Sequence, residues 1–139
     1  MWGWGVALIA VGACDWFDDE SPETATLILE GNGQVRAPVV VSREFTPVVR
    51  GPGDVDIHLT SADTTLRSLP FDTVYDIRGP QRFYVRIERA EPPGAEVWMR
   101  VSIDQNEHYN ELRDPAETPH VFIYAFNQPA LLDSGRRRQ

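Results

Sequence analysis

Alternation of apolar and polar residues dominates the chain from Thr24 onward. It is clearest in segments 55–60, 83–88 and 97–104, where every second residue is apolar. A period of two places the apolar side chains on one face of a β-strand, and a polar second face is typical of antiparallel sheets with one side in water. We therefore expect 83–88 and 97–104 to pair as a hairpin.

Further strands are predicted where β-branched and apolar runs lie between turn residues. These runs are 24–30, 34–41, 45–50, 71–78 and 121–126. Gly31-Asn32-Gly33 predicts a tight hairpin between the first two runs, and 61–70 is expected to be a loop. The run 121–126 is apolar on both faces, so it should lie centrally or have its outer face covered.

No stretch after residue 24 shows a helical repeat of apolar residues. Seven or eight short strands with Gly- and Pro-containing turns predict an all-β fold. The expected architecture is an antiparallel β-sandwich, immunoglobulin-like, and the alternative is a small β-barrel.

Two aromatic features are candidates for a binding face. Trp98 stands on the polar face of its strand, beside Tyr84 if the hairpin register is simple. Tyr84 and Trp98 are therefore possible partner-binding residues, since an exposed apolar patch marks an interaction site. Phe122, Tyr124 and Phe126 share one face of the last strand, and we expect them to fill the core.

The segment 104–118 is interpreted as a long loop of functional interest, because connections of this length are uncommon in compact domains. It carries oxygen-bearing side chains of the kind that hard cations prefer. The possible metal ligands, with calcium as the ion, are Asp104, Asn106, Glu107 and Glu111. The spacing does not match an EF-hand, and the alternative is a solvated loop with a short helical turn.

Catalytic motifs are not found. The sequence contains no Gly-x-Ser-x-Gly elbow, no phosphate-binding glycine loop and no His-Glu-x-x-His stretch. His58 lies on the polar face of its strand, and His120 is expected to have a simple turn role. We therefore expect no enzymatic activity.

The first fourteen residues form an apolar segment that ends at the only cysteine, Cys14. A helix of residues 2–13 would be about 18 Å long, which is short of a bilayer core of roughly 30 Å. The sequence Val11-Gly12-Ala13-Cys14 resembles the lipobox of bacterial lipoproteins. The resemblance implies cleavage before Cys14 and acylation of its thiol, hence a palmitate-type anchor in the cell envelope, facing the periplasm or exterior. The resemblance does not decide between an anchor in the inner membrane and one in the outer membrane.

The chain is thus divided into four parts. We expect residues 1–13 to be a signal peptide, 14–23 a lipidated acidic tether, 24–132 the β-sandwich domain and 133–139 a disordered basic tail. The formal net charge of −8 argues against sequence-independent nucleic-acid binding. With the single thiol acylated, no disulfide is expected.

A second resemblance concerns the middle of the chain. The order of Gly51, the strand 55–59, Leu69-Pro70-Phe71 and the strands 83–87 and 100–104 is similar to the MmpS-type small envelope proteins. That family implies a compact β-sandwich outside the membrane that assists a transporter. The expected function is therefore a binding or accessory role in an envelope or transporter complex. The alternative is a small domain that binds calcium or carbohydrate, or a hydrolase, using the 104–118 segment.

Overall fold

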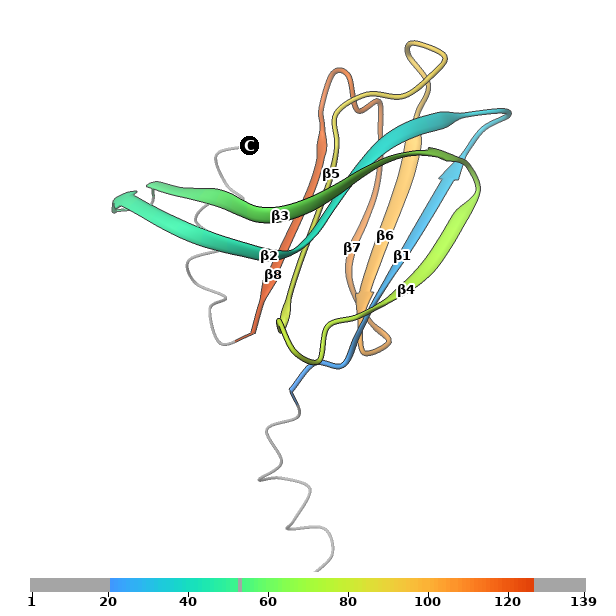
Figure 1. The fold of residues 1–139 in the computed structure, drawn as a ribbon. Coiled ribbons are helices and arrows are strands. Elements are labelled where there is room, and N and C mark those ends of the chain that lie inside the picture. The colour runs from blue at the N-terminus through green and yellow to red at the C-terminus, as the bar shows by residue number, and fades with distance from the viewer. Residues whose placement is uncertain (1–20, 53, 127–139) are drawn as a thin grey trace, which may run out of the picture.

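The computed structural model describes residues 21–52 and 54–126, and within them it contains eight strands and no helix. The strands are β1 (Thr24–Gly31), β2 (Arg36–Gly51), β3 (Asp54–Ser68), β4 (Phe71–Asp76), β5 (Arg82–Ile87), β6 (Val97–Ile103), β7 (Asn106–Arg113) and β8 (His120–Ala125). They form two four-stranded antiparallel sheets, which we call sheet A (β4-β1-β6-β7) and sheet B (β3-β2-β5-β8) (Figure 1). The predicted antiparallel β-sandwich is confirmed, and the sheets do not close into a barrel.

The chain changes sheets more often than the sequence suggested. β1 and β2 lie in opposite sheets, so the Gly31–Gly33 turn makes no hairpin. In immunoglobulin domains, by contrast, the first two strands are neighbours within one sheet.

The expected hairpin of 83–88 with 97–104 is wrong, because β5 and β6 also lie in opposite sheets. The intervening segment pairs with the start of β2: the Arg36 and Glu91 backbones exchange two N–H···O bonds of 2.9 and 2.7 Å. These bonds hold the segment between β5 and β6 against β2, so the chain crosses from one sheet to the other. Alternation within the strands contains no information on such a crossing.

The segment after Asp104 is a strand rather than a loop. β6 and β7 form a hairpin whose two-residue turn is Asp104-Gln105, with φ values of +48° and +70°. Paired positive φ values are typical of type I′ turns, which usually contain Asn-Gly or Asp-Gly. β7 escaped detection because Tyr109 is its one residue packed into the core, while most of its side chains are exposed and polar.

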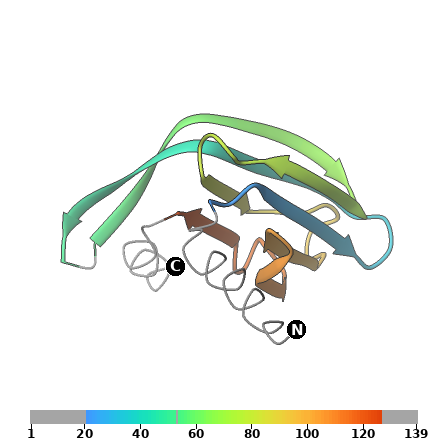
Figure 2. The ribbon, with the colours of Figure 1, turned by 90° about the horizontal axis from the view of Figure 1, so that it is seen from below.

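The main core lies between the two sheets and is built largely from alternate residues of β1, β2, β5 and β6. Its fully buried members include Leu27 and Leu29 of β1, Met99 of β6, and Phe83 and Phe122 of β5 and β8. The expectation that Phe122 fills the core is confirmed. Figure 2 shows the two sheets stacked, with β1 and the β6–β7 hairpin on one side and the long β2–β3 hairpin arching over the other.

A second, smaller cluster covers the outer face of sheet B. Register shifts between Val41 and Phe45 bend β2, and the remaining part of the β2–β3 hairpin departs from β5. Phe45 then packs with Tyr84, Ile123 and Ala125, all at most 7% exposed. This explains the last strand: β8 is an edge strand, apolar on both faces because its outer face is covered.

Two expectations change as a result. Tyr84 is 5% exposed and tilted against Phe45, with ring centroids 6.0 Å apart, so it is unavailable to a partner. The predicted loop 61–70 is mostly strand, since β3 continues to Ser68 opposite Arg36. The sequence Ser61-Ala62-Asp63-Thr64-Thr65 hid this, because it is a small and polar run without apolar alternation on the exposed edge strand of sheet B.

Candidate functional site

The predicted lipid site lies outside the described residues, as do the acidic residues before Ser21 and the basic tail. In the part of the chain that the structure covers, no helix has the length and apolar character needed to cross a bilayer. The described structure therefore bears on the folded domain alone.

The candidate metal ligands do not converge. The Asp104 carboxylate accepts the backbone N–H groups of Glu23 and Thr24 at 2.9 and 3.0 Å, so it fastens the start of β1 to the β6–β7 turn. Glu107 accepts a hydrogen bond from Asn110 at 2.9 Å. Within residues 21–52 and 54–126 no group of three His, Cys, Asp or Glu side chains is arranged to hold a metal ion.

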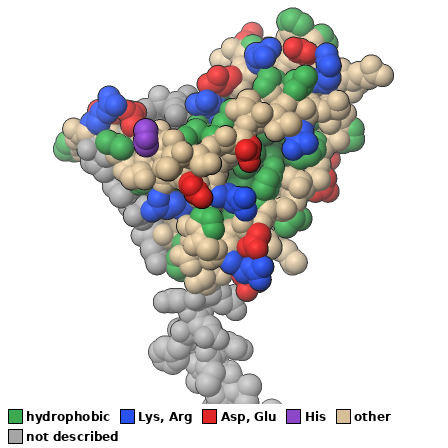
Figure 3. Space-filling view, in the orientation of Figure 1, with side chains coloured by type: hydrophobic (Ala, Val, Ile, Leu, Met, Phe, Trp, Pro, Cys, Tyr) green, Lys and Arg blue, Asp and Glu red, His purple; other side chains and the backbone are tan. Residues whose placement is uncertain are grey.

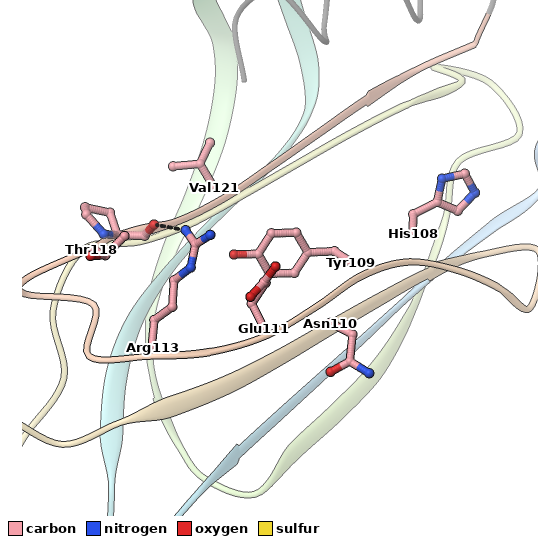
Figure 4. A pocket seen from close by; sticks show the side chains of 8 residues that line it. His108, Tyr109, Asn110, Glu111, Arg113, Thr118 and Val121 are labelled. Atoms are coloured by element: carbon pink, nitrogen blue, oxygen red, sulfur yellow. Dashed lines mark hydrogen bonds between the residues drawn. The ribbon is translucent and has the colours of Figure 1, made fainter. Parts of the chain in front are cut away.

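A pocket of about 260 Å³ lies in the seam between β7 and β8 (Figure 4). Arg113 crosses it from β7 and donates a hydrogen bond to the carbonyl of Pro119 at 3.1 Å. Glu111 and the Tyr109 ring lie beside Arg113, whereas His108 points to a separate side. The Tyr109 hydroxyl makes its hydrogen bond with His120, which does not line this pocket.

That hydroxyl is bonded to His120, which is fully buried. The Tyr109 oxygen lies 2.8 Å from His120 Nδ1, and Nε2 lies 2.7 Å from the carbonyl oxygen of Val97. A carbonyl can only accept, so Nε2 carries the hydrogen and Nδ1 accepts from the tyrosine. His120 of sheet B thereby ties itself to two strands of sheet A.

The expectation of a simple turn role for His120 is thus wrong. Sequence reasoning missed this network because its three members lie on three different strands. The one available signal was a histidine opening an otherwise apolar strand.

The free energy of unfolding should fall as the pH drops through about 6.5. Burial lowers the pKa of His120 below its ordinary 6.5, with Arg113 acting in the same direction and the Val97 and Glu111 oxygens opposing it. Below that pH the unfolded chain binds a proton that the folded chain excludes, so acid favours unfolding. The pKa of Asp76 is lowered to about 2 mainly by hydrogen bonds from Arg78, so the stability that this group contributes is lost only as the pH falls below its ordinary 3.8.

Urea unfolding between about pH 7.5 and pH 5.5 measures this effect. The midpoint should decrease over that range, and His58→Gln, which changes an exposed histidine, should leave the decrease intact. A midpoint independent of pH would contradict the neutral, buried state of His120.

Trp98 lies on the outer face of sheet A and is 39% exposed. Its position is nevertheless fixed on two sides. The indole N–H donates to Asn110 Oδ1, and the Arg100 guanidinium lies over the ring at 5.2 Å from its centroid. Arg100 is in turn held by Glu30 at 2.6 Å.

An apolar stripe runs from Trp98 diagonally across all four strands of sheet A. Val74 on β4 is diagonal to Ile28 on β1, Ile28 is diagonal to Trp98 on β6, and Trp98 is directly opposite Leu112 on β7. Val74 and Leu112 are 61% and 56% exposed. We call these four residues the Trp98 stripe.

A groove of about 330 Å³ lies at one end of the Trp98 stripe. Its lining residues are Glu30, Gly31, Asn32, Glu96, Trp98 and Leu112. A wider depression of about 680 Å³ is also present, but its charged residues Arg36 and Glu91 already pair with each other at 3.1 Å. On the face that Figure 3 shows, basic and acidic side chains are interspersed without a large area of one sign.

The groove lies far from the point where the chain enters the domain. β1 begins at Thr24 beside Asp104 and ends at Gly31 in the groove, a length of roughly 20 Å at about 3.3 Å per residue. The groove and the N-terminal entry are therefore at opposite ends of sheet A.

Comparison with protein-family models, curated proteins and solved structures finds no match to this chain. The site must therefore be interpreted from its own geometry.

Proposed function

We propose that this protein is a bacterial envelope lipoprotein that binds a protein partner and performs no catalysis. Cys14 anchors it to the inner or outer membrane on the extracytoplasmic side, and the Trp98 stripe is the binding surface. A role as accessory component of an envelope or transporter complex follows from this combination. The weak similarity to MmpS-type proteins points in the same direction.

The observation that carries the proposal is the state of Trp98. Large aromatic side chains are costly to leave in water, and they are frequent anchors at protein interfaces. Here the ring is exposed and yet oriented by Asn110 and Arg100. A side chain fixed before binding loses little conformational entropy when a partner covers it.

The length of the tether limits how far the folded domain can lie from the bilayer. Ten residue steps separate Cys14 from Thr24, which span at most about 35 Å at 3.3–3.6 Å per residue. The groove is at the opposite end of sheet A from the start of β1, so attachment of the tether there leaves the groove uncovered. This arrangement suits a partner protein that projects from the membrane or lies close to the membrane surface.

A hydrolytic or calcium-binding role for 104–118 has less support. Most of that segment is a β-hairpin strand, and Asp104 is engaged with the backbone at the start of β1. Its carboxylates are held apart along the strand or bonded to neighbours. We therefore propose binding on sheet A in place of chemistry at this segment.

The proposal is tested by crosslinking in native membranes followed by purification of the full chain. We expect an envelope protein to be recovered with the wild type and lost with Trp98→Ala. Leu66→Ala is the matched control, since Leu66 is 49% exposed but lies on β3 of the other sheet. Equal recovery with Trp98→Ala would contradict the proposal.

A further inference from the structure

We infer that the groove beside Trp98 receives a lysine or arginine side chain from a basic segment of the partner protein. The inference rests on the proposed binding function and adds the chemistry of the partner. It is carried by the charge of the groove and by a contact that the domain makes with its own Arg100.

Arg100 shows how this surface holds a cation. Its guanidinium lies over the Trp98 ring and binds the Glu30 carboxylate at 2.6 Å. Arg100 does not line the groove, whereas Trp98 and Glu30 do. Arg100 already balances the Glu30 charge, so Trp98 is the element that a second cation can use, because its ring also lines the groove.

The other lining residues complete a site for a long basic side chain. Glu96 is exposed and makes no ion pair with any residue in 21–52 or 54–126. It adds to the groove lining a carboxylate that no arginine in the described part of the chain neutralises. Leu112 is 56% exposed and offers an apolar wall for the methylene stem of a lysine or arginine.

Long-range charge favours the same partner. The chain carries a formal net charge of −8, and such a field accelerates encounter with basic segments. A neutral sugar could also stack on tryptophan, but it gains nothing from the charge of Glu96. The groove chemistry therefore favours a cationic peptide over a carbohydrate.

The test is a titration of the full-length protein, purified in neutral detergent, with a fluorescein-labelled heptalysine peptide, followed by anisotropy. We expect saturable binding that weakens about fivefold in Glu96→Gln, the effect of one partly exposed ion pair. Trp98→Ala should weaken it by about thirtyfold, as expected for an interface anchor. The matched control Glu117→Gln removes the same charge from an exposed site outside the groove and should change the affinity less than twofold.

Three results would overturn the inference. One is no saturable binding of heptalysine, and another is equal weakening by Glu96→Gln and Glu117→Gln, which would indicate non-specific attraction. The third is Trp98-dependent binding of chitotetraose in its place. If Trp98→Ala still abolishes recovery of a membrane partner, these results reject a basic segment as the ligand of the groove. The proposed partner-binding function is then retained.

Discussion

Replacing His120 with alanine is expected to lower the free energy of unfolding by about 3–5 kcal/mol. The ring is fully buried, so its removal leaves a cavity between the sheets. The Tyr109 hydroxyl and the Val97 carbonyl also lose their hydrogen bonds to the imidazole. Thermal unfolding followed by circular dichroism should show a midpoint at least about 12 °C lower for a domain of this size.

Two variants serve as references for that measurement. His58→Ala removes an exposed histidine and should change the stability by less than about 0.5 kcal/mol. Tyr109→Phe keeps the ring packing and removes one hydrogen bond, so it should cost about 1–2 kcal/mol. A His120→Ala midpoint equal to that of His58→Ala would show that the network does not join the sheets.

Replacing Cys14 with serine is expected to abolish fatty-acid incorporation and to leave the N-terminal segment uncleaved. Acylation contributes about 0.8 kcal/mol per buried methylene, and two or three chains are needed for stable anchoring. Serine offers no thiol for a thioether. Metabolic labelling with an alkyne fatty acid, with mass spectrometry of the purified chain, measures both effects.

The control restores a cysteine outside the lipobox. Ser21→Cys combined with Cys14→Ser keeps one thiol in the chain, seven positions further along. This double variant should remain unlabelled, because the signal depends on the residues that precede the cysteine. Labelling of the Cys14→Ser chain at the wild-type level would contradict the predicted lipid anchor, and with it the proposed location in the cell envelope.

The strands could largely be predicted from the sequence, but their partners could not. Alternation in 83–88 and 97–104 gives the inward and outward face of each strand correctly, and it contains no information on which strand lies alongside. The Glu91 backbone decides that question by pairing with Arg36. β7 was missed for a different reason: as a polar edge strand with Tyr109 as its one core residue, it has no apolar period.

The candidate site, like the fold, could be predicted only in part. The position of Trp98 on the outer face follows from the alternation in its strand, whereas its degree of exposure was left open by the sequence. Its contacts with Asn110 and Arg100, and the groove beside it, depend on the register of three strands. The burial of Tyr84 depends on the bend in β2 at residues 41–45, and no sequence pattern in this segment indicates that bend.

Site-specific photocrosslinking in living cells tests the central claim most directly. A photoreactive amino acid at Leu112 lies in the groove, and one at Leu66 has similar exposure, 49% against 56%, on the other sheet. We predict one crosslinked envelope protein from position 112, lost when Trp98→Ala is added, and none from position 66. Crosslinks of equal yield from both positions, or from 66 alone, would contradict a binding role for the outer face of sheet A.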